Sequence, residues 1–407
     1  MMDIKNLFLK LTGITMISVS IFSCQENNGN QQDLTDNKKE EVLIPELLDQ
    51  TRQRLDFLLD FPAREDAIPR TVEEDGTVRT VASSDWTSGF FPGTLWYAYR
   101  LTNHDDFKEK AKTWTTFVEQ EKLNDGTHDM GFKIYSSFGN GYEITDNQSY
   151  EDVIIKSAET LSSRYNEKVG AIKSWDWGKT RWDFPVIIDN MMNLELLFEA
   201  TKITGDSSFY KIANQHAITT LENHFRSDNS SYHVVDYNPE TGEVIKKLTH
   251  QGHSDQSAWA RGQAWGLYGY IMTYRYTEED LFLQQAEEIA AFMLQHENLP
   301  EDKIFYWDYD APNIPDAVRD ASAAAITAAA LVELHQQTEE EQYLQSSIAI
   351  VNSLQKNYLL PANISVPFIL NHSTGNMPRN DEIDVPINYA DYYFLEAMYR
   401  LQQLNTK

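Results

Sequence analysis

The chain has 407 residues, of which 41% are hydrophobic and 12% aromatic, so it is long and apolar enough to bury a large core. Its formal net charge of −28 excludes nucleic acid as a partner and disfavours anionic lipid surfaces. The only cysteine is Cys24, which excludes an internal disulfide. This charge also repels a long polyanion, so an anionic substrate is expected to be small and held by local cations.

The N-terminal segment has the pattern of a lipoprotein signal peptide. Residues 1–23 begin with Lys5 and Lys10, continue with an apolar run, and end before Cys24 in the sequence IFSC. We expect Cys24 to be lipidated and to attach the protein to the cell envelope. This lipid anchor would be its only contact with a membrane, because the apolar run is too short to span one comfortably. The polar residues 24–40 are expected to form a flexible tether.

Residues 41–407 are predicted to form one all-α domain, because apolar residues recur at helical spacing along it. Residues 321–334 are apolar on nearly every side, which predicts a helix buried among other helices. The expected helices cover residues 41–60, 89–103, 106–122, 131–140, 149–164, 187–203, 208–225, 256–275, 280–296, 319–336, 340–357 and 387–404.

Twelve helices form six pairs, and the loops between them alternate between short and long. This pattern predicts a closed barrel of six helical hairpins, with the long loops gathered at one mouth. One β-hairpin is expected near residues 232–248, with strands at 232–237 and 244–248 joined by the turn NPETG.

The most distinctive stretch is HQGHSDQSAWARGQAWGLYGY at residues 250–270. From Ser257 on, the pattern can form a helix, in which Trp259, Gln263 and Gly266 fall three or four residues apart, as do Arg261 and Trp265. Indole faces beside a guanidinium suit a sugar ring that bears a carboxylate. The alternative is a buried helix in which the tryptophans fill the core and Arg261 forms a structural ion pair.

Two aspartates are candidates for acid–base chemistry. Asp189 follows an apolar run and precedes a predicted helix, so partial desolvation could raise its pKa. Asp129 lies between His128 and a methionine–glycine pair on a predicted loop. Structural roles are also open, since Asp189 could cap the following helix and Asp129 could stabilise a turn.

Weaker candidates are Trp86, in a loop rich in glycine and proline, and His233, on the predicted hairpin. Each could contact a ligand or serve only the fold. The sequence has no metal-ligand spacing, no phosphate-binding glycine loop and no GxSxG motif, so no metal or other cofactor is expected.

Together these motifs resemble the family 88 glycoside hydrolases, the unsaturated glucuronyl hydrolases. The resemblance covers nearly the whole predicted domain, and its most specific part is the run around Arg261. In chain order the motifs are WTSGFFPG at 86–93, HDMGF at 128–132, IDNMMN at 188–193, SAWARGQAWG at 257–266, DAS at 320–322 and YADYYFL at 389–395.

The resemblance implies an (α/α)6 barrel that acts on an oligosaccharide with a 4,5-unsaturated uronate at its non-reducing end. It implies that Asp189 protonates C4 and activates the water that adds at C5, without a cofactor. Asp129 would hold substrate hydroxyls and tune the field around Asp189. The positions that correspond to sugar and carboxylate contacts are Trp86, His128, His233, Gln251, Trp259, Arg261 and Trp265.

Two other functions remain open at this point. One is an unsaturated galacturonyl hydrolase of the rhamnogalacturonyl type (family 105), although that family favours RGNGW where this chain has RGQAW. The other is a lipoprotein that binds glycans without catalysis, which would not need Asp129, Asp189 and Arg261 in one pocket. The residues around Trp175 and the loop at 372–381 are expected to help select the leaving sugar.

Overall fold

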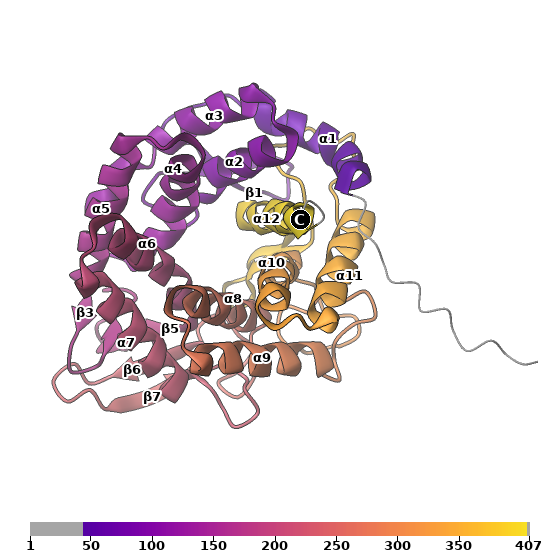
Figure 1. The fold of residues 1–407 in the computed structure, drawn as a ribbon. Coiled ribbons are helices and arrows are strands. Elements are labelled where there is room, and N and C mark those ends of the chain that lie inside the picture. Colours follow the sequence, from indigo (N-terminus) through magenta and orange to yellow (C-terminus); the bar gives the residue numbers. More distant parts are fainter. Residues whose placement is uncertain (1–43, 405–407) are drawn as a thin grey trace, which may run out of the picture. The chain divides into compact units, whose positions relative to one another are not determined.

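Six inner helical segments pack against one another in a closed ring, and six outer helices surround them (Figure 1). The computed structural model describes residues 44–404. The inner ring runs through α2 (Phe90–Thr102), η2 (Gly131–Gly139) with α4 (Asn140–Thr145), α6 (Leu194–Thr204), α8 (Ala260–Thr277), α10 (Ala321–Thr338) and α12 (Asn388–Leu404). The outer ring comprises α1 (Ile44–Asp60), α3 (Asp105–Thr116), α5 (Gln148–Ser162), α7 (Ser207–His224), α9 (Asp280–Gln295) and α11 (Glu341–Asn357).

Each outer element precedes an inner one along the chain, so the described residues form six helical hairpins. This arrangement confirms the predicted (α/α)6 barrel. Local signals set the hairpin boundaries: α6 ends at Gly205 in the left-handed conformation, and the Asp206 side chain then caps α7 by accepting from Ser208 N. The inner helix α10 is buried from Ala321 to Leu334, as its alanine-rich sequence predicts.

Two expected helices have a different form at the site. The helix expected at 131–140 is the π-helix η2 followed by α4, and the helix expected at 187–203 starts with a 3-10 turn, η3 (Ile188–Asn193), before α6. The helix expected at 256–275 begins only at Ala260. The helix expected at 106–122 ends at Thr116, and the 3-10 helix η1 (Glu119–Leu123) follows.

Short strands form the walls of one end of the barrel. The expected hairpin is present as β6 (Val234–Tyr237) and β7 (Val244–Leu248), and β6 also pairs with the unexpected strand β5 (Phe184–Ile187). Three further hairpins were not predicted. They are β1 (Ile68–Val72) with β2 (Val78–Val81), β3 (Tyr165–Asn166) with β4 (Ala171–Ile172), and β8 (Ser373–Asn376) with β9 (Asp381–Val385), the last pair being joined through η4 (Met377–Arg379).

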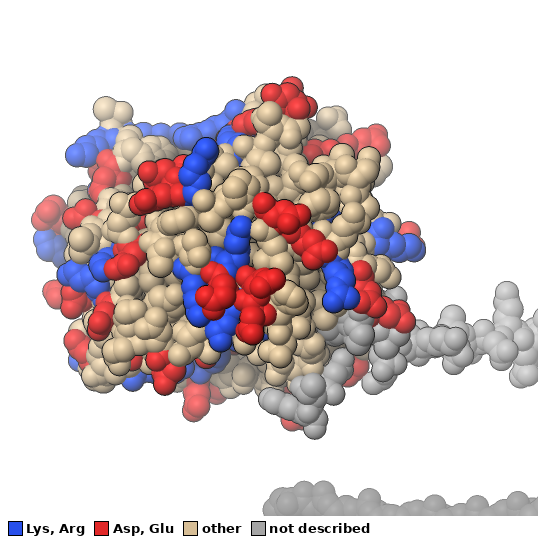
Figure 2. Space-filling model, turned by 90° about the horizontal axis from the view of Figure 1, so that it is seen from above, with Lys and Arg blue, Asp and Glu red and all other residues tan. Residues whose placement is uncertain are grey.

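All described residues belong to one compact unit. The predicted signal peptide at 1–23, Cys24 and the tether at 24–40 lie outside these residues. Within residues 44–404, helices that combine the length and the apolarity needed to cross a bilayer are absent. Acidic and basic side chains are interspersed over the face shown in Figure 2.

Candidate active site

A pocket of about 790 Å³ lies where the inner helical segments begin. Its lining includes Trp86 before α2, Asp129 before η2, Asp189 before α6, Arg261 in the first turn of α8, and Tyr389 in the first turn of α12. Helix N-termini bear a partial positive charge, so this end of the barrel favours an anionic ligand despite the net charge of −28. Among residues 44–404, no group of three or more His, Cys, Asp or Glu side chains could hold a metal ion.

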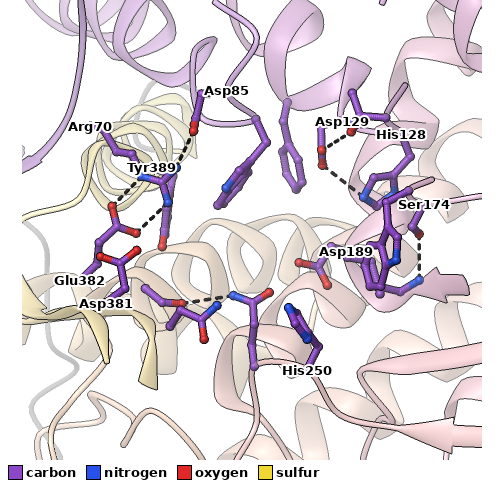
Figure 3. Close-up of a pocket in the computed structure, with 18 of the residues that line it drawn as sticks. Arg70, Asp85, His128, Asp129, Ser174, Asp189, His250, Asp381, Glu382 and Tyr389 are labelled. Carbon is purple, nitrogen blue, oxygen red and sulfur yellow. Dashed lines mark hydrogen bonds and ion pairs between the residues drawn. The ribbon is translucent and has the colours of Figure 1, made fainter. Parts of the chain in front are cut away.

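Asp189 lies in the 3-10 turn η3, and its side chain points into the pocket (Figure 3). The residue is only 7% exposed. Burial raises the pKa of this carboxyl to about 6, although His128 and Arg261 partly oppose the shift. The alternative role of Asp189 as a helix cap does not match the structure, because the cap of α6 is Asn193 and the cap of η3 is Ile187. Asp189 can therefore exist as an acid near neutral pH.

Asp129 lines the same pocket, but the pKa of its carboxyl is shifted in the opposite direction. Burial alone would raise its pKa, but His128, Thr127 and Lys133 outweigh burial and hold the pKa below its usual value. His128 Nε2 lies 3.2 Å from Asp129 Oδ1, and the Thr127 hydroxyl donates to Oδ2. The pocket thus contains one carboxyl of raised pKa and one of lowered pKa, a pattern by which two carboxyls in one site take different roles.

Close main-chain packing fixes the segments that bear these groups. A Cβ on Gly89 would lie 2.2 Å from the carbonyl oxygens of Phe132 and Lys133, so only glycine allows the Trp86 loop to approach η2 this closely. On the other side of η2, Phe132 N donates to Asn193 Oδ1 over 3.1 Å. The π-helix is therefore held between the loop before α2 and the turn that contains Asp189.

A buried polar network supports η2 from below the pocket. Lys133 is fully buried, and its Nζ lies 3.1 Å from Glu121 Oε2 and donates to the Ser84 carbonyl over 2.8 Å. Glu121 also accepts from Ser83 Oγ over 2.7 Å. This network connects η2, η1 and the loop that bears Trp86.

His233 is buried beside Asp189 and has a defined tautomer. The backbone N–H groups of His250 and Gln251 both donate to His233 Nδ1 over 3.0 Å, so Nδ1 is unprotonated and Nε2 carries the proton. Burial lowers the pKa of His233 well below its usual value, which keeps the ring neutral. Its Nε2 lies 3.7 Å from Asp189 Oδ2, and both atoms are buried without a hydrogen-bond partner within residues 44–404.

Arg261 lines the pocket, but most of its donors are already used. Its Nη1 forms a buried ion pair with Asp320 over 2.7 Å, and its two terminal nitrogens donate to the carbonyls of Thr374 and Gly375 over 2.5 Å each. The guanidinium donors that were expected to bind a substrate carboxylate are therefore mostly used by the protein itself. Gln251 is tied to the same segment, since its Nε2 donates to Gly375 O over 3.2 Å.

The predicted aromatic contacts separate into two groups. Trp86 is half-buried and lines the pocket, where its ring lies 5.1 Å from that of Tyr389. Trp259 is buried beneath Arg261 and beside His233, with a ring distance of 4.7 Å to the histidine, and neither Trp259 nor His233, both predicted contacts, is among the residues that line the pocket. Trp265 is fully buried against Phe132 and is not among the residues that line the pocket. The structure thus places it in the core and not at the predicted ligand contact.

Sequence reasoning missed an ionic cluster on the opposite wall of the pocket. Arg70 pairs with Asp85 and Glu382, with N–O distances of 2.6 Å (Figure 3). Arg79 pairs with Asp381 over 2.9 Å. The cluster joins the β1–β2 hairpin to the β8–β9 hairpin. The Asp-Gly turn at residues 75–76 was the available signal for the first hairpin.

A helical barrel with two carboxyls of opposed pKa in an aromatic-lined pocket is typical of carbohydrate-active enzymes that use acid–base catalysis. The model of Glycosyl Hydrolase Family 88 matches residues 65–359. The chain belongs to this family and is a glycoside hydrolase.

Relatives with this family's activities match over most of the chain. An unsaturated glucuronyl hydrolase of Formosa agariphila is 53% identical over 91% of this chain and 94% of its own length. An unsaturated chondroitin disaccharide hydrolase of Streptococcus pneumoniae is 33% identical over 89% of this chain and 92% of its own length.

Solved structures agree with the fold. An unsaturated glucuronyl hydrolase specific for heparin has a TM-score of 0.87 at 43% identity, covering 89% of this chain and 98% of that structure. The glycosaminoglycan-degrading unsaturated glucuronyl hydrolase of Bacillus sp. GL1 has a TM-score of 0.83 at 28% identity, covering 89% of this chain and 97% of that structure.

Proposed function

We propose that this chain releases 4,5-unsaturated glucuronic acid from the non-reducing end of oligosaccharides that polysaccharide lyases produce. The observation that supports this most directly is the buried carboxyl of Asp189, with its pKa raised to about 6, in one pocket with Asp129. Protonating an alkene carbon needs a carboxylic acid that is still protonated near neutral pH, and an exposed aspartate does not provide one.

The reaction begins with proton transfer from the Asp189 carboxyl to C4 of the unsaturated uronate. Positive charge then develops at C5 and the ring oxygen, close to the ionised Asp129. The Asp189 carboxylate next takes a proton from the water that adds at C5, which restores the acid and forms a hemiketal. Ring opening leaves C1 as a hemiacetal, which releases the leaving sugar as an alcohol.

His233 gives a place for the incoming oxygen. Its Nε2–H and Asp189 Oδ2 are unpartnered and 3.7 Å apart, so one can donate to an oxygen atom while the other accepts its proton. Because its Nδ1 accepts from two backbone amides, the ring keeps this orientation without a charged partner. We assign His233 to holding the water or a substrate hydroxyl beside Asp189.

The substrate carboxylate is placed by neutral donors and helix N-termini rather than by a free arginine. Arg261 contributes its charge from behind Thr374 and Gly375, and the first turns of α8 and α12 line the same pocket. Gln251, His128 and Trp86 complete the proposed contacts. Lyase elimination removes the C4 hydroxyl at which glucuronate and galacturonate differ, so a pectin-derived substrate differs in its linkage and leaving sugar, and the choice of disaccharides in the assay below tests this difference.

We further propose that Cys24 carries a lipid that holds the enzyme at the cell envelope. The support is the IFSC sequence after a short apolar run and the polar stretch that follows it. Metabolic labelling with a radioactive fatty acid tests this: label is expected in the wild-type protein and not in Cys24→Ala.

The decisive experiment follows absorbance near 235 nm, where the unsaturated uronate absorbs. Protein lacking its first 24 residues is mixed with lyase-made disaccharides from chondroitin, heparin, ulvan and pectin. Loss of absorbance with a glucuronate-derived disaccharide is expected, and it should vanish in Asp189→Asn but persist in Asp106→Asn, an exposed aspartate on α3. Binding of the disaccharides without any loss of absorbance would instead support a glycan-binding protein.

A further inference from the structure

Two exposed arginines converge on the mouth of the pocket without a carboxylate partner. Arg379, in η4, lines the pocket and donates to His250 Nε2 over 3.2 Å, and Arg181 lies with its guanidinium 4.5 Å from the ring centre of Trp182. Within residues 44–404, neither guanidinium forms an ion pair, whereas Arg70, Arg79 and Arg261 around the same pocket all do.

His250 is close enough to both arginines for their charges to affect its pKa. His250 lies at the rim, and burial, then Arg379, then Arg181, together lower its pKa to about 4. The two arginines are nearly 200 positions apart in the sequence, so the fold brings them together. An exposed cluster of like charges without counter-charges is unfavourable, and an anionic ligand relieves this repulsion.

Aromatic rings form a surface between the two arginines. Trp175 and Trp177 stack with their centres 4.6 Å apart and their planes within 10°, and Trp177 is 47% exposed. Trp182 packs edge-on against Trp175 at 5.7 Å, and Lys246, which pairs with Asp236 over 3.4 Å, lies 5.1 Å from the Trp182 ring. The nearby carboxylates are matched by cations other than the two arginines, since Asp176 pairs with Arg164 and Lys173, and Asp236 pairs with Lys246.

We propose that this rim (Arg181, Arg379 and Lys246 around Trp175, Trp177 and Trp182) is a binding site for an acidic glycan chain beyond the leaving sugar. With the unsaturated end at Asp189, the rest of the chain must leave through the mouth. It passes Arg379 first, because Arg379 lines the pocket and Arg181 does not. The exposed face of Trp177 stacks on a sugar ring, and the cations hold a sulfate or carboxylate on the next units.

The proposal extends the proposed function from a disaccharide to a longer acidic oligosaccharide, and it rests on that function. Binding is measured by calorimetry in an Asp189→Asn background, where no turnover occurs. The probes are lyase-made unsaturated di- and tetrasaccharides from heparin, which carry sulfates, and from hyaluronan, whose only anions are carboxylates. A wild-type protein that never consumes the 235 nm absorbance would refute the proposed function separately from this binding test.

Because Arg379 lines the pocket and Arg181 lies beyond it, the two substitutions should affect different probes. Arg379→Gln should weaken the binding of the heparin disaccharide and of the tetrasaccharides, and Arg181→Gln should weaken only the tetrasaccharides, by about two- to tenfold at low salt. Arg52→Gln, which removes an exposed arginine from the outer helix α1, is the matched control and should change neither. An effect confined to the heparin probes identifies sulfate as the bound group, and an equal effect on both series identifies the carboxylate.

Two outcomes would overturn the proposal. One is an Arg181→Gln protein that binds tetrasaccharides as tightly as Arg52→Gln does. The other is an equal loss for di- and tetrasaccharides in Arg181→Gln, which would place Arg181 inside the first two subsites or reveal a general structural effect.

Discussion

The guanidinium of Arg261 and the carboxylate of Asp320 form an ion pair of 2.7 Å in which neither side chain is more than 1% exposed. The pair also fixes the β8–β9 hairpin, because Arg261 donates to the carbonyls of Thr374 and Gly375. Arg261 therefore shapes the wall of the pocket as well as contributing its charge.

Removing one partner of this pair should destabilise the protein strongly. In Asp320→Asn the buried guanidinium loses its counter-charge, and we expect the free energy of unfolding to fall by about 3–5 kcal/mol. Urea unfolding measures the change. Lys168→Gln, which breaks the exposed pair with Glu240, is the control and should change stability by less than about 0.5 kcal/mol. A similar small change in both variants would contradict the structural role.

Asp189→Asn should abolish activity while stabilising the fold. Loss of a general acid lowers kcat by about 10²–10⁴-fold. A pKa difference of one corresponds to about 1.4 kcal/mol, so the raised folded-state pKa destabilises the native state by about 3 kcal/mol above pH 6. The asparagine variant should therefore unfold at higher urea concentration than wild type at pH 8, and the difference should shrink toward pH 4. Equal stability at both pH values would show that Asp189 is not desolvated.

Activity should fall as pH rises through the pKa of Asp189. Its acid form is required and its pKa is about 6, so kcat/KM should decline about tenfold per pH unit well above that value. The negative charge of Asp129 contributes to raising this pKa. In Asp129→Asn the residual activity should therefore decline at lower pH than in wild type. A decline at the same or higher pH would rule out coupling between the two carboxyls.

Lys133→Met should shift the acidic limb of the pH profile, where activity is lost as the pH falls. Lys133 is one of the groups that lower the pKa of Asp129, so its removal should raise the pH below which activity is lost. The double variant Lys133→Met with Glu121→Gln removes both charges of the buried pair and so restores stability. If the double variant also regains the wild-type pH profile, Lys133 has only a structural role.

Gly89→Ala should disrupt both stability and activity. The added methyl would lie 2.2 Å from two carbonyl oxygens of η2, so the main chains must separate, and we expect a loss of about 3 kcal/mol. Gly266→Ala in α8 is the matched control, because its methyl would meet its nearest neighbour, Ile289, at 3.5 Å. Alanine favours a helix over glycine, so the control should be neutral or more stable by about 0.5–1 kcal/mol. Circular dichroism melts and the 235 nm assay measure both effects.

The barrel could be predicted because each helix and its ends are specified by residues that lie close together in the sequence. Helical segments lie in all twelve ranges that apolar spacing marked, and signals such as Gly205 and Asp206 marked helix ends. The π-helix after Asp129 was not predictable, because apolar spacing does not distinguish hydrogen bonds to the fourth residue from those to the fifth.

The residues of the candidate site could be predicted from the sequence, but the contacts between them could not. Asp129, Asp189, Trp86, His128, Gln251 and Arg261 line one pocket, which the motifs indicated. The ion pair of Arg261 depends on Asp320, 59 residues away, and the rim brings together Arg181 and Arg379. Such long-range partners follow from the closure of the ring, and no local pattern encodes them.

The close contact between Gly89 and η2 has a consequence for how this enzyme can diversify. The acid–base pair depends on main chain packed against main chain, which substitutions elsewhere cannot readjust in small steps. The rim depends on side chains that extend from short hairpins and exposed turns. New substrate preferences can therefore be selected at the rim while the chemistry of the pocket stays the same, which makes the mouth of the barrel the natural target for directed evolution.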